Sequence, residues 1–491
     1  MARKLTRRVF VKGSLVSAAA LTIPATITRN VLGANDEINA AVIGVNSRGG
    51  SHIGALQRQS GVAITSICDA DQNVLDRTVK SLEARNKKEV KGYQDIRKML
   101  DDKELNVITV ATPNHWHSLM AIWAMQAGKD VYLEKPVSHN VWEGRQAVKA
   151  ARKYKKICQT GTQSRSSRRG IGGAVEYVQS GKLGKIQYAV GTCYKPRKSI
   201  GKLDKPLEIP SNVDYDLWCG PAAKVDLYRP RFHYDWHWDF NTGNGDVGNQ
   251  GIHQMDIARW FLGETTLSPR VLSIGGRLGY DDAGNTPNTQ VVFHEYEKAP
   301  LIFEVRGLPR EGLDWGKGMD NYRGSGVGVI GQCEGGHVVI PNYYSASAHD
   351  TKGERIESWR EGDPMTAHVG NFIDCVRSRK HTDLNADIEE GHLSSALCHT
   401  GNISHVLGKT MTADQIKDVV KGNKVYTDSY ERMADHLGKN GIDIKGKTLT
   451  LGAWLDMDGK AEVFKNNAAA NKLLTREYRK GYEVPDIDRI A

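Results

Sequence analysis

Residues 38–49 read Ile-Asn-Ala-Ala-Val-Ile-Gly-Val-Asn-Ser-Arg-Gly, an apolar run that ends in a turn flanked by glycines. Such a run predicts a buried strand. The turn from Gly44 to Gly49 would leave backbone N–H groups and a helix N-terminus available to hold a pyrophosphate. Asn46 takes the place of the usual second glycine in G-x-G-x-x-G, and asparagine tolerates left-handed backbone. The stretch therefore predicts a nucleotide-binding half.

The pattern that starts at residue 38 continues as an alternation of short apolar runs and amphipathic stretches, typical of a parallel sheet with crossover helices. Expected strands span residues 38–44, 62–69, 107–111 and 131–134, and expected helices span 119–127 and 141–154. After about residue 160 the chain changes to β-rich segments with glycine-rich connections, at 187–192, 271–276, 289–294 and 301–306. These segments predict a second, sheet-based domain.

Length and composition fit two or three folded domains, since the chain has 491 residues, 39% of them hydrophobic and 25% charged. The net charge of +10 is concentrated at the start, where six basic and no acidic residues precede residue 35. The remainder has 61 basic and 57 acidic residues. Because basic and acidic residues are nearly equal in number there, nucleic acid is disfavoured as a partner.

The basic start has the pattern of a targeting segment. Thr6-Arg7-Arg8-Val9-Phe10-Val11-Lys12 precedes an uncharged run over residues 13–28 and resembles a twin-arginine export signal. The run is too short and too rich in Ser and Thr to span a membrane. We therefore expect residues 1–34 to be a signal, the Tat export machinery to be a partner, and the mature protein to be periplasmic without a membrane anchor. The alternative is a basic cytosolic N-terminus.

Seven cysteines are present, and none forms a Cys-x-x-Cys pair. The odd number and the spacing argue against a disulfide framework and a structural zinc site. We expect most of them to be reduced core residues, which suits folding in the cytoplasm before export.

Asp69 ends the second expected strand, about 25 residues after the glycine turn. A carboxylate here can accept a hydrogen bond from a ribose hydroxyl and would repel a 2′-phosphate. The position therefore favours NAD and makes NADP less suitable. The alternative is that Asp69 only caps the following helix.

Two further motifs carry a family resemblance: Ala-Thr-Pro-Asn-His-Trp-His over residues 111–117, and Gly-Lys-Asp-Val-Tyr-Leu-Glu-Lys-Pro over residues 128–136. In this order after the glycine turn, the pair is similar to the Gfo/Idh/MocA family, the glucose-fructose oxidoreductase and inositol dehydrogenase group. The resemblance extends from Ile38 through the segment 243–256 to a helix over residues 391–403.

The resemblance implies an α/β protein: an N-terminal Rossmann doubly wound parallel sheet, then an α/β domain with a large, open-faced, mostly antiparallel sheet. We expect the Rossmann domain over residues 35–160 and the substrate and oligomerisation domain over 161–422. The polar, lysine-rich residues 423–491 are expected to form a C-terminal extension that packs on the body. The family further implies NAD(P), a sugar or cyclitol substrate and a homo-oligomer.

The residues expected to hold the cofactor come from the glycine turn, the end of the second strand and the two motifs. They are Gly44, Asn46, Ser47, Arg48, Gly49, Asp69, Thr112, Asn114, His117, Glu134 and Lys135.

Lys135 is implied by the resemblance to lie between nicotinamide and substrate, where an ammonium group stabilises a developing alkoxide and relays its proton. His253 matches the histidine of the family segment Asp-x-Gly-x-His-x-x-Asp and is the candidate general base. Asn249 occupies the place of the usual aspartate four residues before this histidine. The acid/base division between Lys135 and His253 is therefore open.

Aromatic residues are dense over residues 232–240, where Trp236 and Trp238 alternate with histidine and aspartate. Flat rings beside carboxylates suit a pyranose, although core packing is the alternative for each ring. By family analogy, Gln163 and Arg165 are expected to contact the substrate together with these tryptophans and His253. The histidines do not have a convincing metal-ligand spacing, so we expect no metal.

Three functions compete. The first is an NAD-dependent oxidoreductase acting on a carbohydrate hydroxyl, with the cofactor bound tightly and recycled internally. The second is an NAD-dependent glycoside hydrolase or lyase that oxidises the sugar transiently, although that branch usually lacks the Glu-Lys-Pro lysine. The third is a non-catalytic sugar-binding protein, which the presence of both Lys135 and His253 disfavours.

Overall fold

The computed structural model describes residues 37–490. The expected signal segment, residues 1–34, lies outside the described residues. Within residues 37–490, no helix combines the length and the apolar character needed to cross a membrane.

The N-terminal domain is a six-stranded parallel sheet with the order β3-β2-β1-β4-β5-β6. Its strands are β1 (Ile38–Ile43), β2 (Val62–Cys68), β3 (Lys91–Tyr93), β4 (Val107–Val110), β5 (Asp130–Leu133) and β6 (Cys158–Thr160). The helices are α2 (Arg48–Leu56), α3 (Gln72–Asn86), α4 (Ile96–Met99), α5 (His117–Gln126) and α6 (Val141–Lys153). All residues of β4 and β5 are buried, as expected for strands covered on both faces. The predicted Rossmann sheet is confirmed.

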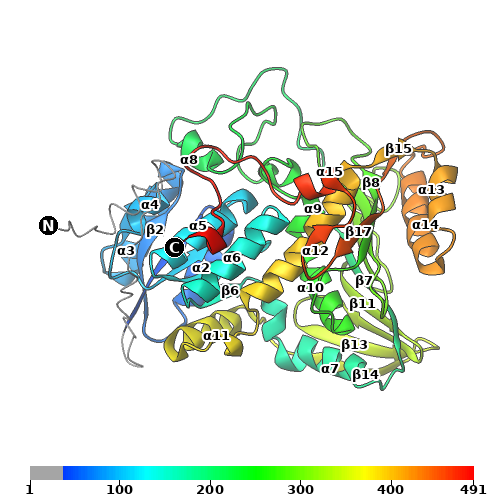
Figure 1. Cartoon of the computed structure of the whole chain (residues 1–491), viewed down its shortest axis with the longest axis horizontal. Helices are drawn as coiled ribbons and strands as arrows, with labels where there is room; N and C mark the ends of the chain where they lie inside the picture. The colour runs from blue at the N-terminus through cyan, green and yellow to red at the C-terminus, as the bar shows by residue number, and fades with distance from the viewer. Residues whose placement is uncertain (1–36, 491) are drawn as a thin grey trace.

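The second domain has a twelve-stranded sheet within the described residues (Figure 1). It contains β7 (Ile186–Tyr194), β8 (Arg270–Gly276), β9 (Thr289–His294), β10 (Leu301–Arg306), β11 (Val327–Cys333), β12 (Gly336–Ile340), β13 (Ser345–Asp350), β14 (Arg355–Arg360), β15 (Lys409–Met411), β16 (Leu449–Leu451), β17 (Leu455–Asp458) and β18 (Val463–Phe464). β7 pairs in parallel with β10, and the other pairings are antiparallel. The predicted mostly antiparallel sheet is confirmed.

Helices cover both faces of the middle of this sheet. On one face lie α10 (Gly251–Leu262) and α12 (Ile388–Val406), together with α7 (Gly173–Gln179). On the other face, α13 (Ala413–Val420) and α14 (Lys424–Lys439) pack against β8, β9 and β10. The buried side chains Tyr426, Tyr430, Met433 and Leu437 recur at helical spacing and form the apolar stripe of α14.

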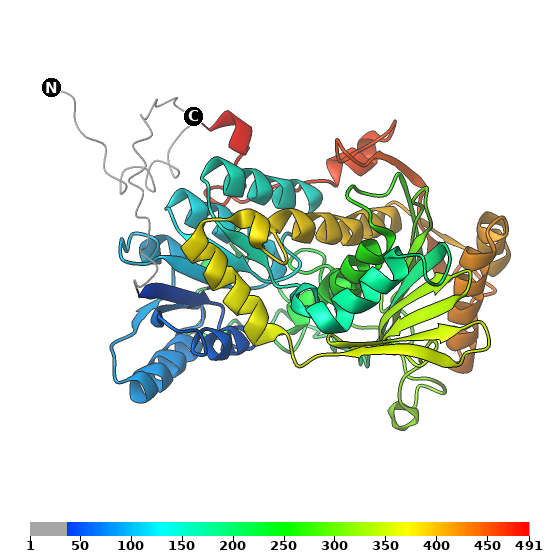
Figure 2. The ribbon, with the colours of Figure 1, turned by 90° about the horizontal axis from the view of Figure 1, so that it is seen from below.

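Two helices connect the domains. α12 packs against α6 of the Rossmann domain and against α10 and β8 of the second domain, and Figure 2 shows it running between the two. α11 (Met365–Ser378) packs on α2 and contributes to the Rossmann core. Gly391 of α12 faces Thr160 so closely that a side chain there would overlap the threonine. These contacts fix the ends of β5 and β6 beside α9 (Gly245–Asn249) and α10.

Two long segments of irregular structure also cross between the domains. The connecting segment, residues 195–244, includes α8 (Tyr215–Cys219) and bonds to the start of α3, just after β2, where Gln72 N donates to Asn212 O at 2.8 Å. The C-terminal residues follow α15 (Ala468–Lys472) back to α6, where Ile487 N donates to the side chain of Gln146 at 2.9 Å (Figure 1).

Candidate active site

The glycine turn between β1 and α2 has the geometry of a phosphate-binding turn. Gly44 has φ +79°, and a Cβ there would lie 2.7 Å from the carbonyl oxygen of Ala111. A side chain at Gly49 would overlap the carbonyl of Gly44. Ser47 is the N-cap of α2 but makes no side-chain cap hydrogen bond. The first N–H groups of α2 therefore lack a side-chain acceptor, which fits a pyrophosphate. Asn46 lies at the exposed rim, where it accepts from Arg77.

Asp69 ties this turn to the end of β2. Its carboxylate accepts from Val45 N at 2.8 Å and from Asp71 N at 3.0 Å. Burial raises the pKa of Asp69, and the two N–H donors oppose that shift. The helix cap of α3 is Asp71, whose side chain accepts from Val74 N. The alternative that Asp69 only caps the helix is thus wrong, and its expected bond to ribose stays a prediction.

The motif at 111–117 joins the two domains. Asn114 donates to the side-chain oxygen of Asn244 at 2.9 Å. The ring of His117 lies between Pro136 O, at 2.6 Å, and Thr112 O, at 2.8 Å. Burial lowers the pKa of His117. These contacts position the chain around the Lys135–Pro136 peptide, which is cis.

Glu134 follows β5 and is buried, with Arg48 Nε at 2.6 Å and His52 Nε2 at 3.0 Å. Burial alone would raise its pKa, but Arg48 and His52 hold the pKa well below its usual range. Gly161 allows this carboxylate its position, because a Cβ there would lie 3.0 Å from Glu134. Arg48 is therefore drawn towards Glu134 across the phosphate turn.

Lys135 contacts α9 of the second domain. Its Nζ donates to Asn249 O at 2.7 Å and lies 3.3 Å from Asn249 Oδ1. The pKa of Lys135 is lowered to about 8, chiefly by burial, with Glu134 opposing the shift and Arg48 and Lys195 adding to it. Both oxygens that bind this ammonium are neutral, so Asn249 adds no negative charge at the position where the family resemblance predicts an aspartate.

His253 lies in the first turn of α10 and is buried, 5% exposed. Its Nδ1 has no hydrogen-bond partner within residues 37–490. Burial, followed by the nearby Lys135, holds the pKa of His253 well below its usual range. The imidazole is therefore neutral at pH 7 and can accept a proton from a bound hydroxyl. The buried side-chain oxygen of Gln163 also has no hydrogen-bond partner within the described residues.

Sequence reasoning missed three residues that surround this pair. The Gln250 amide donates to Tyr343 OH at 2.7 Å, and the ring of Tyr343 lies 5.0 Å from that of His253. Lys195 Nζ donates to Gln250 Oε1 at 3.2 Å. The proximity of Gln250 to Asn249 was the only sequence signal available. Lys195 follows β7, and Tyr343 lies between β12 and β13; neither residue lies in a recognisable local motif.

The aromatic segment, residues 232–240, lies close to Lys135, since burial and then the charge of Lys135 lower the pKa of His237. The ring of Trp236 stacks on His237 at 3.6 Å, and Trp238 is 5% exposed beneath Arg197, at 4.8 Å. Arg197 in turn binds Asp246 through two nitrogens, at 2.6 and 2.7 Å. Trp238 is thus largely a packing residue, and the contact of both tryptophans with substrate stays a prediction.

Arg165 is engaged in ion pairs rather than unpartnered. Its guanidinium binds both oxygens of Asp256 and also Glu390, at 2.9 Å. The side chain is 9% exposed. It holds residues 163–166 against α10 and α12, so it positions Gln163 and the neighbouring backbone. Its direct contact with substrate remains a prediction.

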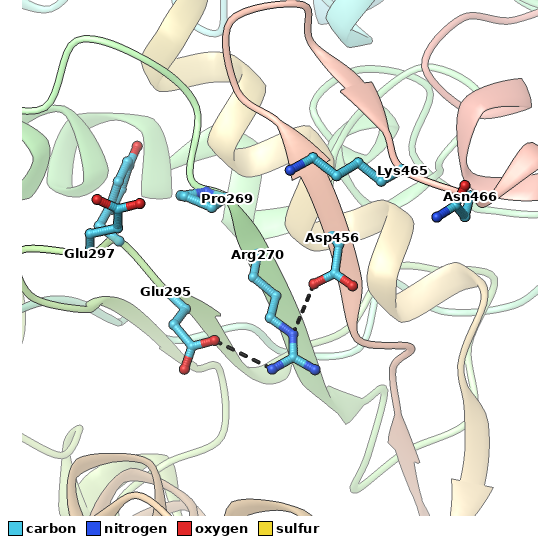
Figure 3. A pocket seen from close by; sticks show the side chains of 8 residues that line it. Pro269, Arg270, Glu295, Glu297, Asp456, Lys465 and Asn466 are labelled. Carbon is cyan, nitrogen blue, oxygen red and sulfur yellow. Dashed lines mark ion pairs between the residues drawn. The ribbon is translucent and has the colours of Figure 1, made fainter.

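A pocket outlined in Figure 3 is separate from these residues. It lies where β8 meets β17 and is lined by Pro269, Arg270, Glu295, Tyr296, Glu297, Asp456, Lys465 and Asn466. Arg270 pairs with Asp456 at 3.1 Å and with Glu295 at 3.6 Å. Three of the pocket's five charged side chains are thus paired with one another. Within residues 37–490, no group of three His, Cys, Asp or Glu side chains is placed to hold a metal ion.

The fold and this site define a two-domain, dinucleotide-binding oxidoreductase. Residues 38–162 match the family model of the oxidoreductase NAD-binding Rossmann fold (GFO_IDH_MocA), and residues 178–303 match that of the family's C-terminal alpha/beta domain. Together the two matches span about half of the chain. The chain belongs to the Gfo/Idh/MocA oxidoreductase family, and its N-terminal domain is the family's NAD-binding domain.

Similar proteins fall into two groups. A protein of Shewanella baltica named "Glycosyl hydrolase family 109 protein" is 33% identical over 127 residues, which is 25% of this chain and 28% of that relative. One from Shewanella putrefaciens is 32% identical over the same length. The match thus spans little more than a quarter of these relatives.

Solved structures share the fold at low sequence identity. The WlbA dehydrogenase of Bordetella pertussis, in complex with NADH and UDP-GlcNAcA, has a TM-score of 0.54 and 19% identity, over 74% of this chain and 94% of that one. Levoglucosan dehydrogenase in complex with NADH has a TM-score of 0.55 and 15% identity, over 74% and 97%.

Proposed function

We propose that the protein is an NAD-dependent oxidoreductase that acts on a hydroxyl group of a sugar or sugar derivative. The observation that carries this proposal is the pairing of a buried lysine of lowered pKa with a buried, neutral histidine. Lys135 is bonded to Asn249, four residues before His253, so both groups border the junction of the two domains. The dehydrogenase neighbours crystallised with NADH support the proposal through fold only.

NAD, which the turn from Gly44 to Gly49 and Asp69 would hold, would supply a hydride acceptor for the carbinol carbon. His253 takes the hydroxyl proton through a ring nitrogen, so that hydride and proton leave together and a carbonyl forms. Lys135 donates a hydrogen bond to the oxygen as negative charge develops there. Asn249 holds the ammonium through neutral oxygens, which orients Lys135 without neutralising its charge.

A direct test is an assay of the purified protein with a panel of sugars and sugar derivatives, followed by mass spectrometry of the products. A keto-sugar formed from a hydroxyl, lost in Lys135→Met and His253→Ala, supports the proposal. Substrates bound but unchanged by the wild-type protein would favour a non-catalytic sugar-binding protein.

The second candidate is an NAD-dependent glycosidase, which the relatives named as family 109 glycosyl hydrolases favour. In that reaction the sugar is oxidised transiently, the aglycone is eliminated and the final reduction regenerates NAD. Assaying aryl glycosides beside free sugars separates the two. Release of the aglycone without net oxidation would select the glycosidase.

We also propose that the protein is exported by the Tat machinery to the periplasm with NAD already bound, and that it forms a homo-oligomer. The arginine pair at residues 7 and 8 supports export, and the connecting segment supports retention. This segment lies against the start of α3, two residues after Asp69, where His233 Nε2 is 3.0 Å from Asp71. Cell fractionation and light scattering of the purified protein test location and assembly.

A further inference from the structure

Of the basic side chains that the structure describes around Lys135, the arginines form ion pairs with carboxylates and the lysines do not. Arg48 binds Glu134, and Arg197 binds Asp246, each at 2.6 Å. Lys135 and Lys195, the lysine pair, bind only the neutral side chains or backbone of Asn249 and Gln250. Within residues 37–490, neither ammonium has a carboxylate at ion-pair distance. Two positive charges therefore remain beside the proposed reaction centre.

Lys195 is directed towards this centre by its contacts. It follows β7, and Gln250 fixes its Nζ at 3.2 Å while also binding Tyr343, which lies against His253. Gln250 is adjacent to Asn249, the partner of Lys135. Lys195 is also only half-buried, so it can reach a ligand. Lys198, three residues further on, is exposed and lies over Trp315 instead.

Two unpaired ammonium groups beside one site repel each other, and partial burial strengthens the repulsion. Lys195 is one of the charges that lower the pKa of Lys135. A bound anion would offset this cost, because a charge-assisted hydrogen bond to an ammonium is stronger than a neutral one. One ammonium beside a neutral amide matches a single negative charge, whereas a phosphate dianion favours several cations or a guanidinium fork.

We propose that the substrate is a sugar acid and that Lys195 binds its carboxylate, an inference that rests on the proposed function. Lys195 thereby determines specificity. Lys135 remains available for the hydroxyl that is oxidised, so the two lysines serve two ends of one substrate.

The test measures binding to the protein with its NAD, by intrinsic tryptophan fluorescence and calorimetry. Matched ligands are glucose and glucuronate, galactose and galacturonate, and the methyl glycosides of glucose and glucuronate. The expected result is that the wild-type protein binds the acids about tenfold more tightly or better than the neutral partners. Added salt should weaken binding of the acids only.

Variants assign the preference to Lys195. Lys195→Met should abolish the preference while leaving affinity for neutral sugars within about threefold, and Lys195→Arg should restore part of it. Lys198→Met, a lysine lost from the same segment, should behave as wild type. Unchanged NAD content and thermal melting in each variant show that the fold is intact.

Several outcomes would overturn the inference: no preference for the acid in any pair, no binding of any acid, or a preference that survives in Lys195→Met. Tighter binding of glucose 6-phosphate or glucose 6-sulfate than of glucuronate would overturn the assignment of a carboxylate. Oxidation of neutral sugars with no acid preference would remove this inference and leave the proposed function standing. No oxidation of any sugar, acidic or neutral, would count against the proposed function itself.

Discussion

The ammonium of Lys135 is held by Asn249 through two neutral oxygens, the backbone carbonyl at 2.7 Å and the side-chain amide at 3.3 Å. Family resemblance leads one to expect an aspartate at this position, which would place a negative charge against the ammonium. With asparagine, burial dominates and the pKa of Lys135 falls to about 8. We therefore expect a charge at position 249 to shift the pH range in which Lys135 is protonated.

Asn249→Asp should raise the pKa of Lys135 by about one unit or more, because an opposite charge favours the protonated form. If the protonated lysine stabilises the alkoxide, wild-type kcat/KM should fall as pH rises through about 8. In the variant this fall should move to higher pH. The pH profile of kcat/KM measures it. A descending limb at the same pH in both proteins would contradict the assignment of that limb to Lys135.

Lys135→Met should preserve the fold and NAD binding but slow hydride transfer by about 10²–10⁴-fold, the usual contribution of a positioned acid/base group. Single-turnover absorbance of the reduced nicotinamide reports the step. Lys424→Met is a matched control, since that side chain is 85% exposed and pairs only with Asp428 on the surface. An unaltered rate in Lys135→Met would refute the role of the lysine.

NADP should bind at least about tenfold more weakly than NAD, about 1.4 kcal/mol, because its 2′-phosphate would approach the carboxylate of Asp69. Calorimetry or thermal shift with each cofactor measures the difference. Asp69→Asn should reduce the difference in affinity between NAD and NADP. The turn should still fold, because the amide oxygen can accept a hydrogen bond from the backbone N–H of Val45 or Asp71. Equal or tighter binding of NADP by the wild-type protein would remove Asp69 from the adenosine site.

The fold was predictable because its signals are local. The apolar run at 38–43 and its turn predict β1 and α2, and the later β-rich segments predict β7 to β10. Lys135, Asn249 and His253 were found because each lies in a short motif. Lys195, Gln250 and Tyr343 were missed because their contact depends on the pairing of distant strands and on side-chain packing.

The ion pairs of Arg165 were missed for the same reason, because they too depend on residues that are distant in the sequence. Family analogy predicted that Arg165 contacts the substrate, but the sequence pattern does not reveal that Asp256 and Glu390 form ion pairs with its guanidinium. At position 249 the residue itself is evident from the sequence, but its effect is not. A single amide is visible in the sequence, yet its electrostatic effect depends on the burial of Lys135 and the nearby Lys195, which only the structure provides.

If the protein is exported as proposed, it should retain its NAD, because a periplasmic enzyme has no cytosolic nicotinamide pool with which to exchange a reduced cofactor. The cofactor would then be inserted during folding and returned to its starting oxidation state in each cycle, by reduction of a second sugar or of the same one. Retention requires a dissociation constant well below micromolar, that is, more than about 8 kcal/mol of binding. Protein purified without added cofactor should release near-stoichiometric NAD on denaturation, and added NAD should raise the rate little.

His233→Ala breaks the contact between the connecting segment and Asp71, so it should speed NAD dissociation. Tyr228→Ala, at an exposed residue of the same segment, is the control and should leave dissociation unchanged. An empty site with steady turnover of added NAD would instead indicate an ordinary soluble dehydrogenase, and equal dissociation in both variants would show that the segment does not retain the cofactor.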